Sequence, residues 1–148
     1  MHLREATTAD LDHILELEQE TFPETAFSRG TFLYYMDAAS SRVCLLIAEH
    51  APVGYVVYTV RGHPPVVYVD SIAVEPEHRG KGYGRRMMEH VREAARRAGV
   101  RHVKLHVRES NHRAQDFYRA LGFEAVGTVE SYYRNGEDAC IMRLPAGD

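Results

Sequence analysis

The sequence predicts a mixed α/β (α+β) fold in which one sheet of about seven strands combines with four helices. The first observation is the order of hydrophobic patterns, in which alternating and helical spacing follow one another as β-α-α-β-β-β-α-β-α-β-β. The second is a helical segment between the fourth and fifth strands, because a crossover helix of this kind joins strands that run parallel. The third is a set of short turns between other strands, which predicts antiparallel hairpins.

The N-terminal part of the chain is expected to hold one strand and two helices. Residues 2–6 form the strand, and Thr7 caps the first helix with Asp10 three positions later, a variant of the capping box. Helical spacing is carried by Leu11, Ile14, Leu15, Leu17 and Glu18. Pro23 cannot continue this helix, and Ser28 is expected to cap the second one.

Three strands connected by short turns are predicted next. They cover about 42–49, 53–61 and 66–74, each rich in β-branched or aromatic residues. Ala51-Pro52 is expected to turn the chain between the first two, and Gly62-His63-Pro64-Pro65 between the second and third.

The C-terminal half contains two more helices and three more strands. The helix after the glycine-rich segment 79–84 buries a face formed by Met87, Met88, Val91, Ala94, Ala95 and Ala98. Gly99 is expected to end it in the left-handed conformation. The strand over 103–107 alternates cleanly, so that His102, Lys104 and His106 share one face. The remaining elements are a helix over 111–121, strands over about 123–130 and 137–144, and a hairpin turn at Asn135-Gly136.

The composition predicts one soluble globular domain over residues 1–148. Hydrophobic residues make up 45% of the chain and charged residues 26%, with a formal net charge of -3. No apolar run approaches the roughly 20 residues of a membrane span, and the first residues lack the apolar stretch of a signal peptide. Cys44 and Cys140 lie in apolar runs, which favours buried reduced thiols and a cytoplasmic location. The nine histidines show no ligand spacing, so we expect no metal.

The most informative segment is Arg79-Gly80-Lys81-Gly82-Tyr83-Gly84, between a predicted strand and a predicted helix. Glycines permit a tight turn close to a ligand, and the free N–H groups of a helix N-terminus bind phosphate oxygens. With Arg85 and Arg86, four cationic side chains gather on an acidic chain, which favours a small anionic ligand over nucleic acid. The alternative is an ordinary glycine-rich connector, and the P-loop and dinucleotide-binding patterns are both absent.

Two segments resemble the coenzyme-contacting segments of the GNAT acetyltransferase superfamily. Val74-Glu75-Pro76-Glu77-His78 and the glycine-rich segment after it resemble that superfamily's coenzyme A loop, whose core is Arg/Gln-x-x-Gly-x-Gly/Ala. Ser110-Asn111, Phe117-Tyr118 and Leu121-Gly122-Phe123 resemble its second segment, at the usual separation. The resemblance covers essentially the whole chain. It implies the GNAT fold, with the fourth and fifth strands splayed apart, and acetyl-CoA as the acetyl donor.

The same resemblance implies roles for individual residues. Backbone N–H groups around Ile72, Ala73 and Val74 would stabilise the oxyanion, and the glycine-rich loop would hold the pyrophosphate. Asn111 would lie near the pantetheine arm, and Tyr118 would protonate the departing thiolate. Periodicity alone favours Tyr118 as a core tyrosine of an ordinary amphipathic helix, whereas the Asn111-to-Tyr118 spacing within the matching segment favours the functional role.

The acceptor side resembles N-terminal protein acetyltransferases, including the bacterial ribosomal-protein-alanine type. Phe22-Pro23-Glu24 and Tyr132-Tyr133 match the two loops that close over a peptide in those enzymes, which implies a protein or peptide N-terminus as acceptor. The alternative is that Phe22 caps the core and the two tyrosines are ordinary strand residues. We expect a monomer or weak dimer without nucleic-acid or membrane partners.

One position departs from the bacterial type, which usually has glutamate where this chain has His106. A histidine there, with Tyr68 on the neighbouring strand, resembles eukaryotic acetyltransferases of the NatE type and implies His106 as general base. By alternation we expect Tyr68, Asp70 and Ile72 to share one face of their strand, with Asp70 beside the acceptor. The alternative for His106 is a solvent-facing strand residue beside Lys104.

Two other functions remain open from the sequence. One is acetylation of a small amine, such as a polyamine or aminoglycoside, for which an open acidic groove would be expected. The other is a non-catalytic acyl-CoA-binding module that has lost turnover. The intact Tyr118 and the Tyr68–His106 pair favour an enzyme.

Overall fold

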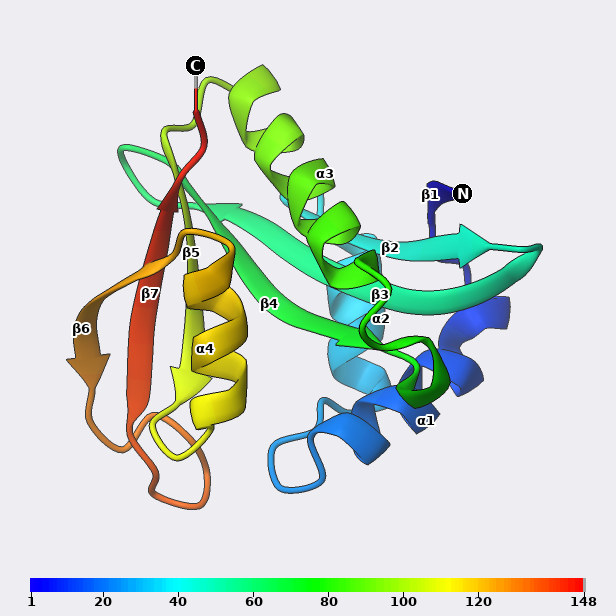
Figure 1. Ribbon diagram of the computed structural model, residues 1–148, viewed down its shortest axis with the longest axis horizontal. Coiled ribbons are helices and arrows are strands. Elements are labelled where there is room, and N and C mark those ends of the chain that lie inside the picture. Colours follow the sequence, from blue (N-terminus) through cyan, green and yellow to red (C-terminus); the bar gives the residue numbers. More distant parts are fainter. Residues whose placement is uncertain (148) are drawn as a thin grey trace.

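A seven-stranded sheet with helices on both faces forms the framework of the protein, as the computed structural model of residues 1–147 describes it (Figure 1). The strands are β1 (His2–Glu5), β2 (Ser41–Ala48), β3 (Ala51–Arg61), β4 (Val66–Val74), β5 (His102–Arg108), β6 (Glu124–Val129) and β7 (Ala139–Pro145). The helices are α1 (Leu11–Thr21), α2 (Arg29–Asp37), α3 (Tyr83–Arg97) and α4 (His112–Ala120), with short 3₁₀ turns at Thr8–Asp10 and Pro76–His78. The strand order is β1-β2-β3-β4-β5-β7-β6, and β4 pairs with β5 in parallel while the other neighbours pair antiparallel. The predicted fold class is confirmed.

The centre of the sheet opens where β4 and β5 part. These strands pair only from Val67↔Val103 to Val69↔Leu105, although both continue beyond that point. Figure 1 shows the two strands diverging toward their C-terminal ends. The opening therefore begins beside Asp70 on β4 and His106 on β5.

A β-bulge at Asp70 accompanies this opening. Val57 pairs with Ser71 and Tyr58 with Val69, so Asp70 is an extra residue in β4. The prediction that Ile72 shares a face with Tyr68 and Asp70 is wrong for this reason. Because the bulge inserts one residue, Ile72 returns to the α3 side with Val69, and Ser71 takes the face of Tyr68.

The two faces of the sheet bury separate cores. One core lies under α3 and α4 and contains Met87, Met88, Val91, Leu105 and Met142. The other lies under α1 and α2 and contains Leu11, Ile14, Leu17, Phe32 and Tyr55. Met87 and Met88 are thus core residues, as expected from helical spacing. Cys44 and Cys140 are free and buried, also as expected.

The predicted elements agree with the structure apart from local boundaries. The turn expected at Ala51-Pro52 is wrong, because Glu49 and His50 turn the chain with φ angles of 53° and 67°, and β3 already starts at Ala51. The Asp10 carboxylate accepts from the Thr7 N–H at 2.8 Å, but α1 begins only after a 3₁₀ turn. Within the described residues, no helix is long and apolar enough to cross a membrane.

Candidate active site

A cleft of about 180 Å³ passes through the sheet where β4 and β5 part. Its lining includes Asp70, Ser71, His106 and Tyr132, which lie on the face that α1 and α2 cover in part. It also includes Val69, Ile72, Ala114 and Tyr118, which pack with the core under α3 and α4. The cleft is therefore lined by residues from both faces of the sheet.

His106 lies between two aromatic rings on the first of these faces. Its ring is stacked on Tyr132 at 4.4 Å between centroids and 2° between planes, and on Tyr68 at 5.7 Å and 15°. Burial lowers the pKa of His106, and the nearby positive charges of Arg61 and Lys104 lower it further. The imidazole is therefore neutral at pH 7 and able to accept a proton. The structure thus brings Tyr68 and His106 together, as predicted, although Tyr68 lines an adjoining groove rather than the cleft itself.

Tyr118 lies on the opposite face, on α4. Its ring packs edge-on against Phe117 and Phe123, with centroids 5.4 and 5.6 Å away. Burial raises the pKa of Tyr118, so its hydroxyl remains protonated at neutral pH and is a potential proton donor. The ring of Tyr118 packs against the core, and the residue also lines the cleft.

Asn111 lines the cleft and also begins α4. Its side-chain oxygen accepts from the Ala114 N–H at 3.1 Å, so it is the N-cap of that helix. The amide NH₂ of Asn111 is the part left to contact a ligand.

The backbone of β4 beyond Val69 has no strand partner on the side of β5. The Glu75 N–H donates to Val53 of β3, so by antiparallel alternation the N–H of Ala73 also faces β3. The same alternation turns the N–H groups of Ile72 and Val74 toward the opening. Of the three predicted oxyanion donors, Ile72 and Val74 therefore have the suitable orientation and Ala73 does not.

The glycine-rich loop joins β4 to α3. Gly80 and Gly82 have φ angles of 81° and 83°, a conformation that only glycine adopts without strain, and Gly82 is the N-cap of α3. The N–H of Arg86 donates to the carbonyl of Gly82 at 3.0 Å, so the free N–H groups at the start of α3 are those before Arg86. The side chain of Arg79 donates to the Val74 carbonyl at 3.1 Å, which holds the loop against the end of β4.

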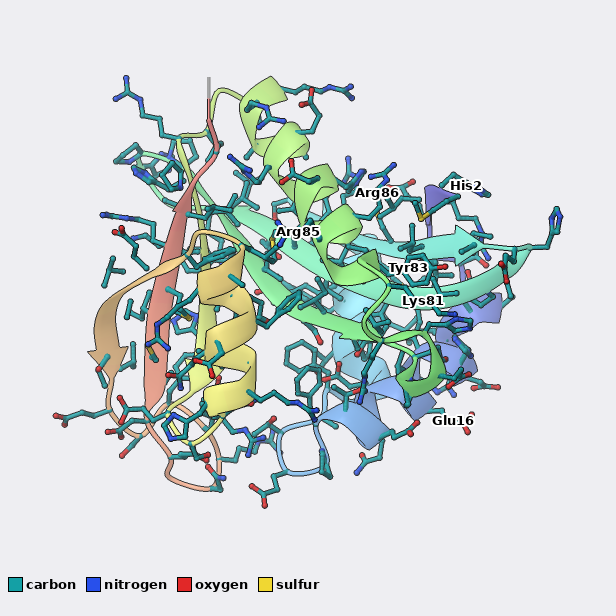
Figure 2. All side chains as sticks on the ribbon, in the orientation of Figure 1. His2, Glu16, Lys81, Tyr83, Arg85 and Arg86 are labelled. Atoms are coloured by element: carbon teal, nitrogen blue, oxygen red, sulfur yellow. The ribbon has the colours of Figure 1, made fainter. Side chains whose placement is uncertain are left out.

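The loop also lies beside α4. A Cβ on Gly84 would stand 2.7 Å from Cζ of Phe117, so the Phe117 ring of α4 packs directly against this glycine in the first turn of α3. Figure 2 shows Lys81 and Tyr83 at this end of α3, with Arg85 and Arg86 on opposite sides of the helix. The start of α3 and the helix that carries Tyr118 therefore lie next to each other on one face of the sheet.

The two predicted acceptor loops flank the other face. Phe22, Tyr132 and Tyr133 line the cleft, whereas Pro23 and Glu24 do not. Glu24 instead stands at the rim, where it accepts from Arg108 at 3.2 Å and from Asn135 at 3.4 Å. These contacts connect the segment after α1 to the segment between β6 and β7 across the cleft.

Glu18 is a cleft residue that sequence reasoning did not single out as functional. It is 2% exposed, and its carboxylate accepts from the Tyr55 hydroxyl, from Ser71 Oγ at 2.7 Å and from the Phe27 N–H at 2.9 Å. The sequence feature that could have identified Glu18 is its position on the apolar face of α1, with Leu11, Ile14 and Leu17. This carboxylate anchors the segment after α1 to β3 and β4.

Comparison with known proteins agrees with this geometry. The N-alpha-acetyltransferase RimI of Mycobacterium tuberculosis is 36% identical over 154 residues, covering 96% of this chain and 90% of that protein. An uncharacterized protein of Mycobacterium leprae is 38% identical over 151 residues, and the match covers 95% of this chain but only 39% of that relative. The crystal structure of the ribosomal-protein-S18-alanine N-acetyltransferase from Escherichia coli has a TM-score of 0.80 and 27% identity, covering 99% of this chain and 94% of that one.

Residues 11–123 match the acetyltransferase (GNAT) family. The match includes the glycine-rich loop, and it also includes α1, β4, β5 and α4, which all contribute residues to the cleft. With this match and the relatives above, the chain belongs to the GNAT family of acetyltransferases.

Proposed function

We propose that the protein transfers the acetyl group of acetyl-CoA directly to the α-amine of a protein or peptide N-terminus. The observation that carries this proposal is the cleft through the sheet, with Tyr118 on one face and His106 on the other. A donor bound on the α3–α4 face and an acceptor bound on the opposite face would meet between β4 and β5. No covalent enzyme intermediate is needed in such an arrangement.

The residues around the start of α3 fit a coenzyme A pyrophosphate. The left-handed Gly80 and Gly82 expose backbone N–H groups, and the helix N-terminus favours negative charge. Arg79, Lys81, Tyr83 and Gly84 complete this proposed loop. Asn111 would contact the pantetheine arm through its free amide NH₂.

Tyr118 is the proposed general acid. A thiolate leaves more readily when it is protonated, and the raised pKa of Tyr118 keeps its proton available near the cleft. The N–H groups of Ile72 and Val74 would stabilise negative charge on the carbonyl oxygen during the transfer.

His106 is the proposed general base, with Tyr68 orienting it or an intervening water. The acceptor must lose a proton before its nitrogen can attack, and the lowered pKa keeps the imidazole in its accepting form. Asp70 is less suited to this role, because it already accepts from Thr59 at 2.6 Å and from Arg61 at 2.8 Å.

The shape of the acceptor side favours a peptide over a small polyamine. Its walls are Phe22, Tyr132 and Tyr133, which can enclose a peptide backbone. The nearby carboxylates of Glu18 and Asp70 are both occupied by hydrogen bonds from the protein, so they offer little to a polycation. The names of the M. tuberculosis and E. coli relatives agree with an N-terminal acceptor.

The experiment is an acetylation screen of the purified protein with acetyl-CoA. Peptides that differ at positions one and two would be compared with polyamines and aminoglycosides. The proposal expects acetylated peptide N-termini and slow or absent acetylation of the small amines. Rapid acetylation of a small amine with unmodified peptides would establish the small-amine alternative, and binding of acetyl-CoA without any transfer would establish the non-catalytic one.

A further inference from the structure

A second groove continues from the cleft toward the loop between β3 and β4. It is lined by Arg61, His63, Val66, Tyr68, His106 and Tyr132. Arg61, His106 and Tyr132 line the cleft as well, so an acceptor whose amine lies at His106 could extend into this groove.

Arg61 is the charged group that this groove exposes. Its guanidinium carbon lies 4.1 Å from the centre of the Tyr68 ring, and Nη2 donates to Asp70 Oδ1 at 2.8 Å. The side chain of Arg61 is 47% exposed, whereas that of Asp70 is only 6% exposed. A ligand in the groove therefore meets the cation of this pair rather than its carboxylate.

Two further cations lie on the same face of the sheet. Lys104 is two residues before His106 on β5, and Arg143 is its cross-strand partner on β7. Within residues 1–147, no carboxylate lies within 4 Å of either cation as an ion-pair partner. Glu124, opposite Arg143 on β6, is the acidic residue at the far edge of this surface. The surface beside His106 is thus locally cationic on a chain of net charge -3.

The distance from His106 limits which acceptor residue could reach Arg61. The ring centres of His106 and Tyr68 are 5.7 Å apart, and the guanidinium carbon of Arg61 lies 4.1 Å from the centre of the Tyr68 ring. The sum of these two distances is the largest possible separation between His106 and Arg61. Two to three extended residues span about 7–10 Å. Arg61 is therefore within reach of a side chain at the second or third residue of an acceptor.

We propose that Arg61, assisted by Lys104, forms a subsite that selects an acidic side chain at the second or third residue of the acceptor peptide. The subsite rests on the proposed function, because it requires the acceptor amine to lie at His106. Arg61 has unused N–H donors for a carboxylate, and aromatic contact with Tyr68 fixes its guanidinium.

The test compares kcat/KM for peptides that differ only by Asp, Asn or Lys at position two or position three. We expect Asp to exceed Asn about three- to fivefold at one of these positions, the scale of a partly exposed ion pair. The ratio should fall to about one in Arg61→Gln and persist in Arg61→Lys. It should also shrink in Lys104→Gln, which leaves the Arg61–Asp70 pair intact, and at high salt. Arg97→Gln is the matched control, because Arg97 is an exposed arginine that pairs with Glu93 at the far end of α3.

Two results would overturn the subsite. One is equal kcat/KM for Asp and Asn peptides at both positions in the wild type. The other is an acidic preference that persists in a folded Arg61→Gln protein. If peptides are acetylated without regard to charge, the subsite fails while the proposed function stands. If no peptide α-amine is acetylated, the proposed function fails and the subsite with it.

Discussion

His106 on β5 and Tyr132 in the segment between β6 and β7 form a parallel stack, with ring centroids 4.4 Å apart and planes 2° from parallel. The proposed general base is thus held by a residue of a proposed acceptor loop. The stack also buries the imidazole, and burial is the main cause of its lowered pKa. Occupation of the acceptor site and the proton affinity of the base are therefore physically connected.

His106→Ala should lower kcat/KM about 10²-fold, the usual scale for losing a general base. Protonation removes the base, so activity should fall as the pH drops through the lowered pKa of His106, below about 6.5. His106→Glu should retain more activity than His106→Ala, because a carboxylate can also accept a proton. The measurement is a pH–rate profile of all three proteins, compared directly because the acceptor amine generates an acidic limb of its own.

Tyr132→Ala gives an independent check that the pKa of His106 determines the acidic limb of the pH–rate profile. Removing the stacked ring exposes the imidazole, so the pKa of His106 should rise toward 6.5 in an NMR titration. Tyr34→Ala is the control, because Tyr34 is 68% exposed on α2. An unchanged His106 titration in Tyr132→Ala would show that the stacked ring does not lower the pKa of His106, whereas an unchanged rate and pH profile in His106→Ala would make His106 an ordinary strand residue.

Tyr118→Phe should lower kcat about 10²-fold and change acetyl-CoA binding little. The variant keeps the ring packing against Phe117 and Phe123 and removes only the hydroxyl. Single-turnover kinetics measure the chemical step, with Tyr34→Phe as the control. Normal single-turnover rates in Tyr118→Phe would exclude this residue as the acid.

Gly82→Val should raise the KM for acetyl-CoA strongly. A β-branched residue is strained at a φ of 83°, by about 1–3 kcal/mol, and the N–H groups around it would shift. Gly99→Val is a matched control at the other end of α3, with a φ of 72° and, like Gly82, no atom within 4 Å of an added Cβ. Both variants should lose similar thermal stability, but only Gly82→Val should lose affinity. Equal affinity in both folded variants would contradict the coenzyme site.

Glu18→Ala should destabilise the protein by about 3 kcal/mol in denaturant unfolding. The change leaves the buried Tyr55 and Ser71 hydroxyls without their acceptor and releases the Phe27 N–H. Glu18→Gln keeps the volume and one acceptor oxygen, so it should fall between the wild type and Glu18→Ala. A cost below about 0.5 kcal/mol for Glu18→Ala would show that this carboxylate does not anchor the loop.

Most of the fold could be predicted because periodicity and turn chemistry agree along the chain. Alternation in β5 put His106 on the correct face, and Gly99 ends α3 with a φ of 72° as its position predicts. The turn at Glu49-His50 was not predicted because neither residue belongs to the usual turn residues Gly, Pro, Asn, Asp and Ser, whereas Pro52 does.

The site could be predicted only in part, because its assembly depends on pairing between distant strands. The bulge at Asp70 moves Ile72 to the other face of β4. In the sequence, the sign of this bulge is that the spacing between apolar residues is two from Val67 to Val69 but three from Val69 to Ile72. A prediction from strict alternation does not take this change of spacing into account. The Arg61–Tyr68 contact and the Glu24–Arg108 ion pair join residues that no local pattern connects.

The central claim is most directly tested by locating the transferred acetyl group on a peptide with a free α-amine and an internal lysine. Tandem mass spectrometry of the product should place one acetyl group on the first residue and leave the lysine free. The same peptide with a blocked N-terminus should remain unmodified. Acetylation of the lysine, or equal modification of the blocked peptide, would contradict an acceptor site built for a peptide N-terminus.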